Sequence, residues 1–236
     1  IKKEKFDRVF DLFGNPRTAI QTLLSGIKER YGFNYRYRNI AYNHKFQRPQ
    51  GKERIHQTQL YCSFFSNFGF KCEYSNPNLK MSDETIKKAK ASIPEEFAKI
   101  KPFIAINPNS TFPTRAWPEE NIIAFINLWY EKTNVPVMLT WGPGEEKISQ
   151  SIIDKVGKEK AFMHKAVKLN EFVALLSLLD IFISGDSGPM HMAGAVGTSV
   201  IALFGPTTEV DVQPLGDKNI TLVAKEIECL RCHKEY

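Results

Sequence analysis

The sequence predicts an α/β protein with parallel sheets and two compact units. Three observations support this class: the length of the chain, the periodicity of its second half and the apolar character of its short segments. With 236 residues the chain can form one large domain or two ordinary ones, because single cores seldom grow beyond about 250 residues. Short apolar runs alternate with amphipathic segments, which is typical of parallel strands covered by helices on both faces. We expect the units to be 1–95 and 96–236, with the boundary in a charged stretch that contains Pro94.

The first unit begins with a strand, a turn and a helix. Residues 6–13 have the pattern of a strand, and Gly14-Asn15-Pro16 closes it. Proline suits the first turn of a helix, and the apolar residues that follow fall on one helical face, which we expect to pack on the sheet. These residues are Ile20, Leu23, Leu24 and Ile27. The rest of the unit is predicted as an irregular basic stretch at 34–56, a helix at 56–70, and a helix with a linker at 83–101.

The second unit is predicted to alternate strands and helices. Strands are expected at 103–107, 135–141, 161–164, 181–184, 199–204 and 219–223, and helices at 119–131, 145–156, 170–179 and 189–196. Because such strands run parallel, their carboxyl ends share one edge of the sheet, where ligands of this architecture bind. The functional residues of this unit are therefore expected in the loops that follow its strands.

The formal charge of +6 is unevenly distributed along the chain. Residues 1–100 carry a net charge of +9, and residues 101–236 carry a net charge of −3. Nine Lys and Arg side chains lie between Arg17 and Arg54, mixed with tyrosines. Such a patch suits an anionic partner, for example a phosphorylated lipid head group, an acidic sugar or nucleic acid. A solvated basic surface is the alternative.

The sequence predicts neither a membrane span nor an export signal. The longest uncharged run, 187–208, contains four glycines, two prolines and a histidine, a composition unsuited to a lipid-exposed helix. The N-terminal segment lacks the apolar core of a signal peptide, so we expect a cytoplasmic protein. Four cysteines are too few for a disulfide scaffold in a chain of this length. Cys229 and Cys232 either bind zinc together with His233 or are two ordinary thiols; we expect no metal and no cofactor.

Residues 182–191 pose a question about chemistry. They read FISGDSGPMH and nearly copy the sequence around the nucleophile of trypsin-like serine proteases. That protease fold is an antiparallel barrel, and this half of the chain has the periodicity of a parallel sheet. His191 also lies one helical turn after Ser187, where it is poorly placed to act as a base on the hydroxyl. The hydrolase interpretation is therefore not favoured.

The same loop fits an anion site better. Ser187 and Gly188 offer backbone N–H groups with little side-chain obstruction, and Pro189 suits the first helical position. The positive end of that helix then faces the loop. His191 in the first turn could add a donor. A plain strand-to-helix turn capped by Asp186 is the alternative.

Two further polar loops follow neighbouring strands. In the first, Ser110 and Thr111 are hydroxyl donors, and Arg115 is a fixed cation able to hold a diphosphate through two hydrogen bonds. In the second, Glu145 or Glu146 could accept hydrogen bonds from ribose hydroxyls, as acidic residues do in dinucleotide sites. Both glutamates could equally be first-turn residues that the helix dipole favours.

These segments resemble the bacterial heptosyltransferases, glycosyltransferase family 9. Their C-terminal signature, Asp-Ser/Thr-Gly-x-x-His followed by an Ala-rich helix, a strand and Phe/Tyr-Gly-Pro-Thr, is similar to ISGDSGPMHMAGAVGTSVIALFGPT. Their hydroxyl-x-x-x-Lys/Arg-x-Trp-Pro segment is similar to NPNSTFPTRAWPEENI, and a cysteine pair of many members is similar to Cys229 and Cys232. The resemblance covers most of 103–232 and, more loosely, 6–33. It implies the GT-B fold, with two Rossmann-like domains whose parallel sheets face each other across a cleft, the N-terminal one incomplete.

The resemblance also implies roles for individual residues. Ser110, Thr111 and Arg115 would hold the diphosphate of a nucleotide sugar. The residues implied for the donor as a whole are Ser110, Thr111, Arg115, Glu145, Glu146, Val167, Asp186, Ser187, Gly188, Pro189 and His191. Among them a glutamate would bind the ribose, Val167 the adenine and Asp186 the sugar hydroxyls, and the backbone at 187–188 would meet phosphate. The residues implied for catalysis are Arg115, Asp186 and His191, and those implied for the acceptor are Arg17, Arg36, Arg38 and Arg48.

The implied reaction is an inverting, metal-independent transfer of heptose from ADP-heptose to the Kdo or heptose of the lipopolysaccharide inner core. The enzyme would be cytoplasmic and peripheral to the inner membrane. A general base would remove the acceptor proton while the leaving diphosphate is stabilised electrostatically. The family's base is an Asp in the loop after its first strand, and no residue matches it, since we expect the chain to begin after that unit. It is also expected to stop before the family's last helix.

Asp7 and Asp11 are better explained by solvation and packing than as the base. Two other functions are weighed against heptose transfer. One is a GT-B enzyme that uses another nucleotide sugar, and the other is a nucleotide-sugar or anionic-lipid binding module without a base. A nucleic-acid partner is not expected, because it leaves the three polar loops unexplained.

Overall fold

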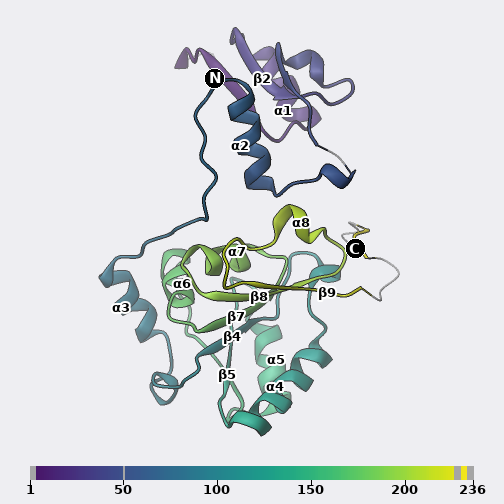
Figure 1. The fold of residues 1–236 in the computed structure, drawn as a ribbon. Coiled ribbons are helices and arrows are strands. Elements are labelled where there is room, and N and C mark those ends of the chain that lie inside the picture. Colours follow the sequence, from purple (N-terminus) through teal and green to yellow (C-terminus); the bar gives the residue numbers. More distant parts are fainter. Residues whose placement is uncertain (1–3, 50, 226–229, 233–236) are drawn as a thin grey trace. The chain divides into compact units, whose positions relative to one another are not determined.

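The computed structural model of the chain describes residues 4–49, 51–225 and 230–232. The chain divides into two compact units, Ile1–Ser75 and Asn76–Tyr236, each with its own parallel sheet (Figure 1). This division falls earlier than the boundary expected between 95 and 96. The cause is helix α3 (Asp83–Ala91), which packs against a helix of the second unit and places Ala89, fully buried, in its core.

Unit 1 is a three-stranded sheet with an aromatic core. Its strands lie in the order β1-β2-β3, and Phe33 and Phe64 are fully buried with ring centroids 5.2 Å apart. The elements are β1 (Arg8–Asp11), α1 (Pro16–Leu24), β2 (Glu29–Phe33), the 3-10 turn η2 (Asn39–Ala41), β3 (His44–Phe46), η3 (Gly51–Glu53) and α2 (Gln57–Asn67). The irregular stretch expected at 34–56 is thus corrected, because it contains β3. That strand has three residues, too few to show an alternating pattern.

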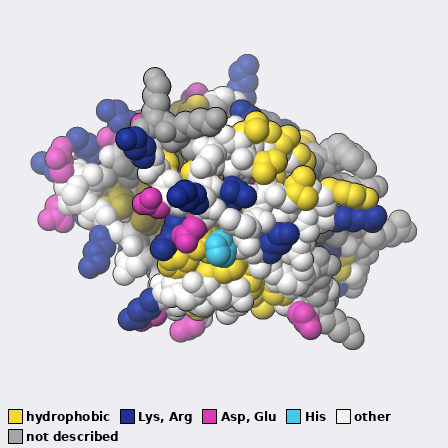
Figure 2. All heavy atoms as spheres, turned by 90° about the horizontal axis from the view of Figure 1, so that it is seen from above, with side chains coloured by type: hydrophobic (Ala, Val, Ile, Leu, Met, Phe, Trp, Pro, Cys, Tyr) yellow, Lys and Arg dark blue, Asp and Glu magenta, His cyan; other side chains and the backbone are white. Residues whose placement is uncertain are grey.

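The expected buried face of α1 is wrong. Ile20, Leu23 and Leu24 are 57%, 43% and 66% exposed. The helix instead turns the small residues Ala19 and Thr22 inward, and Ala19 packs with Ala41 and Tyr42. Ile27 is buried but lies beyond the end of the helix. Figure 2 shows exposed apolar and basic side chains side by side on one face of the molecule.

Asp11 at the end of β1 serves the fold of unit 1. Its buried carboxylate accepts hydrogen bonds from the backbone N–H groups of Phe13 (3.2 Å) and Gly14 (2.8 Å) and from the hydroxyl of Tyr42 (2.6 Å). Burial and this hydrogen bond raise the pKa of the Tyr42 phenol far above its ordinary value. Gly32 leaves room for that phenol, since a Cβ there would lie 2.6 Å from the Tyr42 ring. The three donors account for Asp11 without a catalytic role.

Unit 2 is a six-stranded parallel sheet with helices on both faces. The strand order is β6-β5-β4-β7-β8-β9, so the order of the chain reverses between β4 and β7. The strands are β4 (Ile104–Asn107), β5 (Val137–Leu139), β6 (Ala161–Met163), β7 (Ile181–Gly185), β8 (Ser199–Phe204) and β9 (Ile220–Val223). After α3 and the 3-10 turns η4 (Glu95–Phe97) and η5 (Pro113–Arg115), the helices are α4 (Glu119–Thr133), α5 (Glu146–Val156), α6 (Leu169–Leu176), α7 (Gly188–Ala195) and α8 (Glu209–Val212). The predicted strands and helices of this unit are confirmed within a few residues, and α8 was not predicted.

Two apolar clusters cover the two faces of this sheet. On one face Ile122, Ile126 and Ile152 of α4 and α5 meet β4 and β5. On the other face α3, α6 and α7 pack on the sheet with Leu175 and Met190; Figure 1 shows the two helix layers on opposite sides. Burial on both faces explains why these strands are almost continuously apolar.

One disulfide joins Cys62 of α2 to Cys72 in the segment after it. The sequence did not lead us to expect this pair. Cys229 lies outside the described residues, which contain no cluster of His, Cys, Asp and Glu able to hold a metal ion. No helix in the described part of the chain has the length and apolarity needed to span a bilayer.

The Asp11 hydrogen bonds can be tested by substitution. We expect Tyr42→Phe to lower the free energy of unfolding by about 1–2 kcal/mol, because a buried carboxylate loses a donor, measured by urea denaturation. Tyr37→Phe is the matched control, since Tyr37 is 76% exposed, and it should leave the midpoint unchanged. An equal effect of the two substitutions would contradict this role of Asp11.

Candidate functional site

The candidate site lies at the carboxyl edge of the sheet of unit 2, where the strand order reverses. There β4 and β7 pair in parallel, with Asn107 opposite Ser184 in the register. The loops after β4, β5 and β7 therefore meet at one edge, as predicted. In open parallel sheets this reversal point is where ligands bind.

A polar cavity of about 270 Å³ lies between these loops. Most of the residues predicted from the sequence line it: Ser110, Thr111, Arg115, Glu145, Asp186, Ser187, Gly188, Pro189 and His191. Asn109 also lines it, and its buried Oδ1 atom has no hydrogen-bond partner within the described part of the chain. A polar ligand would satisfy such an atom.

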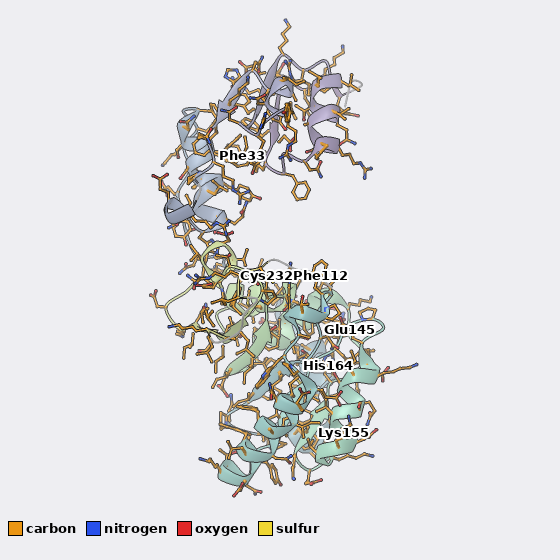
Figure 3. The ribbon with its side chains drawn as sticks, turned by 90° about the vertical axis from the view of Figure 1, so that its right-hand side faces the viewer. Phe33, Phe112, Glu145, Lys155, His164 and Cys232 are labelled. Carbon is orange, nitrogen blue, oxygen red and sulfur yellow. A yellow bond between two sulfur atoms is a disulfide. The ribbon has the colours of Figure 1, made fainter. Side chains whose placement is uncertain are left out.

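Arg115 and Asp186 form an ion pair in the wall of this cavity. Arg115 Nη1 lies 3.1 Å from Asp186 Oδ2, and the side chains are 20% and 12% exposed. The guanidinium also lies 4.4 Å from the centroid of the Phe112 ring (Figure 3). Gly185 allows the approach, because a Cβ there would lie 2.5 Å from the carbonyl oxygen of Arg115. The alternative in which Asp186 caps α7 is wrong, because Ser187 is the N-cap residue and the Asp186 carboxylate pairs with Arg115.

The N-terminus of α7 faces the same cavity. Ser187 is the N-cap residue and Pro189 lies in the first turn. The Ser187 hydroxyl is 2.8 Å from the Ser184 hydroxyl and accepts a hydrogen bond from Asn107 Nδ2 at 3.4 Å. Its hydroxyl is thus held by polar neighbours of the sheet edge, and the partial positive charge of the helix end is directed at the cavity.

Asn107 is a site residue that the sequence reasoning missed. It is 6% exposed, and its amide donates to the carbonyl of Asn109 at 3.0 Å and to the hydroxyl of Ser184 at 3.4 Å. Its Oδ1 accepts from the hydroxyl of Thr140 at 3.4 Å. One side chain thus links the ends of β4, β5 and β7. The available signal was a polar residue at the end of an apolar strand.

A second, apolar cavity of about 620 Å³ continues from the first. The two share Asn107, Glu145 and Pro189. Val167 lines the apolar cavity and not the polar one. The other lining residues are Trp141, Gly142, Pro143, His164, Ala166, Leu169, Phe172 and Met192.

Of the two glutamates predicted from the sequence, only Glu145 is among the residues that line the two cavities. It lines both cavities and accepts a hydrogen bond from the backbone N–H of Gly142 at 2.9 Å. Glu146 is the first residue of α5 and lines neither cavity. The first-turn interpretation thus fits Glu146, whereas Glu145 stands at the junction of the polar and the apolar space.

His164 is buried beside the apolar cavity in a neutral state. Its Nδ1 donates to the carbonyl of Lys165 at 2.8 Å, and its Nε2 accepts from the backbone N–H of Trp141 at 3.4 Å. Burial lowers the pKa of the His164 imidazole below its ordinary 6.5, because the cation would be poorly solvated.

The arginines predicted to bind an acceptor lie in unit 1. Arg17 follows β1 in the chain, Arg36 and Arg38 follow β2, and Arg48 follows β3. Arg17 and Arg36 are exposed. Arg38 donates to the carbonyl of Gly14 at 2.8 Å, and Arg48 donates to the hydroxyl of Tyr35 at 2.9 Å. Because the three strands are parallel, these residues gather at one edge of the sheet. Arg38 and Arg48 have structural partners there.

Comparisons with known proteins agree with this architecture. The model of glycosyltransferase family 9 (heptosyltransferase) matches residues 1–236. Lipooligosaccharide heptosyltransferase 2 of Campylobacter jejuni is 22% identical over 191 residues, which are 79% of this chain and 58% of that protein. The chain therefore spans somewhat more than half the length of this curated relative.

Solved structures show the same fold. A glycosyltransferase family 9 structure from Veillonella parvula aligns with a TM-score of 0.77 at 18% identity, covering 94% of this chain and 65% of the other. A heptosyltransferase of E. coli solved with ADP aligns with a TM-score of 0.68 at 17% identity, covering 93% and 67%. The predicted GT-B fold class and the resemblance to the family are confirmed.

The close approach at Gly185 generates a prediction. Gly185→Ala is expected to lower the free energy of unfolding by about 1–3 kcal/mol, because β7 or η5 must shift to admit the methyl group; chemical denaturation measures it. Gly194→Ala in α7 is the control, since its Cβ would meet nothing nearer than 3.6 Å. The prediction fails if Gly185→Ala is as stable as the parent chain.

The neutral His164 predicts a pH dependence. Because burial lowers the pKa of His164 in the folded chain, the unfolded chain binds a proton at this residue more readily than the folded chain does, so the free energy of unfolding should fall as the pH decreases from 7.5 to 5.5. His164→Gln should flatten that part of the profile. Identical profiles for the two proteins would exclude His164 as the titrating group.

Proposed function

The chain belongs to glycosyltransferase family 9, and we propose that it carries the nucleotide-sugar site of a heptosyltransferase. The proposed donor is ADP-heptose, and the proposed acceptor is the Kdo or first heptose of the lipopolysaccharide inner core. The observation that carries the proposal is the continuity of a polar, cation-bearing cavity with an apolar cavity through Glu145. A nucleoside diphosphate has the same sequence of parts: an anion, a ribose and a flat apolar base.

The donor residues follow from this arrangement. The diphosphate would lie in the polar cavity, within reach of Ser110, Thr111 and Arg115 and of the N-terminus of α7. The ribose hydroxyls would bind Glu145, and the base would enter the apolar cavity next to Val167. That a heptosyltransferase of the same fold was solved with ADP supports adenine as the base.

The proposed chemistry is an inverting displacement at the anomeric carbon. As the bond to the diphosphate breaks, negative charge grows on the leaving oxygen, and Arg115 and the helix end stabilise it. Such fixed positive groups can supply the charge that a metal supplies elsewhere, so we propose a metal-independent reaction. Asp186 would accept hydrogen bonds from sugar hydroxyls, and His191 would line the donor site. We assign the general base to no residue of this chain, and the contacts of Asp11 argue against that carboxylate.

The basic surface of unit 1 fits the proposed acceptor. Arg17 and Arg36 are exposed and follow the carboxyl ends of β1 and β2, where they could meet an anionic sugar. We propose that Arg38 and Arg48 serve mainly to hold this edge. An acceptor of that kind is a lipid at the cytoplasmic face of the inner membrane, so peripheral, salt-sensitive attraction to that surface belongs to the proposal.

Two alternatives differ in a measurable way. A GT-B enzyme with another nucleotide sugar would prefer a uridine or guanosine diphosphate. A non-catalytic binding module would bind the nucleotide without transferring sugar. No observation favours a nucleic-acid partner.

Calorimetric titration with ADP, UDP, GDP, CDP and NAD tests the donor. We expect ADP to bind most tightly and Arg115→Ala to weaken ADP binding about 10- to 100-fold, because a charge-assisted contact contributes roughly 1.5–3 kcal/mol. Lys155→Ala is the matched loss of one positive charge, since Lys155 pairs with Glu119 far from the site (Figure 3); it should bind ADP as the parent does. Equal affinity for all nucleotides, or unchanged binding by Arg115→Ala, would contradict the proposal.

A further inference from the structure

Trp141 and His164 tie together the two loops that enclose the apolar cavity. The indole Nε1–H of Trp141 donates to the carbonyl of His164 at 3.0 Å, and the backbone N–H of Trp141 donates to His164 Nε2 at 3.4 Å. The two rings are nearly parallel, with 9° between their planes and 5.5 Å between their centroids. The pairing of β5 with β6 ends at Leu139 opposite Met163. The contacts between Trp141 and His164 therefore join the two segments beyond the ends of the strands.

The protonation state of His164 makes this connection possible. Because Nδ1 donates to the carbonyl of Lys165, the ring proton resides on Nδ1 and Nε2 remains an acceptor for Trp141. Burial favours the same neutral form. The next residue is anchored too, since the N–H of Lys165 donates to the carbonyl of Ser92 at 2.8 Å. The imidazole is therefore held in one orientation by several elements of unit 2.

Both aromatic residues line the cavity proposed for the base. Phe172 of α6 also lines this cavity, and its ring centroid lies 5.8 Å from that of His164. Trp141 is followed directly by Gly142, whose N–H binds Glu145. A displacement of Trp141 would thus move the wall of the apolar cavity and also the loop that orients Glu145.

We propose that His164 is a positioning residue for the base of a nucleoside diphosphate. It holds Trp141 in place as an aromatic wall and thereby sets selectivity for the base, without contacting the diphosphate. This inference rests on the proposed function, because it takes the apolar cavity as the base site. It goes beyond that function because it assigns selectivity for the base to His164, which lies outside the motifs recognised in the sequence.

The experiment compares His164→Leu with His164→Gln. Leucine keeps apolar volume and removes the acceptor, whereas glutamine retains an acceptor for the Trp141 N–H. Titrations would use ADP and inorganic pyrophosphate, which has no base. We expect His164→Leu to weaken ADP about 5- to 10-fold and leave pyrophosphate unchanged, and His164→Gln to stay within about two-fold of the parent. A merely structural role would weaken both ligands together or affect both variants alike, and either result would overturn the inference.

A second measurement reads the position of Trp141 without a nucleotide. In a Trp117→Phe, Trp129→Phe background Trp141 is the remaining tryptophan of the sequence. Its fluorescence should shift to longer wavelength and become more accessible to acrylamide in His164→Leu, but not in His164→Gln. Unchanged fluorescence in His164→Leu would refute the positioning role. Failure of the proposed function would appear instead in the parent chain, as an absence of preference for ADP.

Discussion

The parallel pairing of β4 with β7 is the constraint on which the site of unit 2 depends. Its register sets Asn107 opposite Ser184, which brings the Asn107 amide within hydrogen-bond reach of the Ser184 and Ser187 hydroxyls. A shift of one residue would turn Asn107 to the other face of the sheet and separate these groups. Because the strand order also reverses at this pair, the loops that follow diverge and leave a hollow between them.

The ion pair between Arg115 and Asp186 explains how a largely buried cation is stable in that hollow. An isolated, largely buried guanidinium would cost several kcal/mol in lost hydration. Asp186 offsets that cost for Arg115, and Phe112 covers one face of the guanidinium. The pair needs the close approach that Gly185 allows. The local charge is thus balanced before any ligand arrives, and an incoming anion would compete with Asp186 for Arg115.

The sequence predicted what depends on burial and chain order. The strands at 103–107 and 199–204 are almost entirely apolar because helices cover both faces of the sheet. Polar residues at and after their carboxyl ends indicated the edge where the site was predicted. It could not predict features decided by contacts distant in the chain. The inward face of α1 packs its Ala19 against Ala41 and Tyr42, and these partners lie too far along the chain for the periodicity of the helix alone to reveal them.

The same limit applies within the site. The sequence pattern does not distinguish Glu145 from Glu146. They differ in the structure because the Glu145 carboxylate accepts a hydrogen bond from the backbone N–H of Gly142. Asn107 and His164 were missed because their importance lies in partners on other strands. Motif residues at Arg115 and Asp186 were found because their chemistry can be recognised from residue type and order alone.

The two cavities divide the work of the proposed site. In the proposed reaction, the charge at Arg115 and at the end of α7 would attract any diphosphate, so it would contribute affinity and transition-state stabilisation but little choice among nucleotides. Choice must come from the apolar cavity, where shape and stacking differ between bases. A wall already held by His164 loses less conformational freedom when a base enters, and preorganisation of this kind increases affinity for the fitting base without any new contact. Because Glu145 contacts the loop of that wall and also lines the polar cavity, a poorly fitting base would disturb the ribose and diphosphate positions as well.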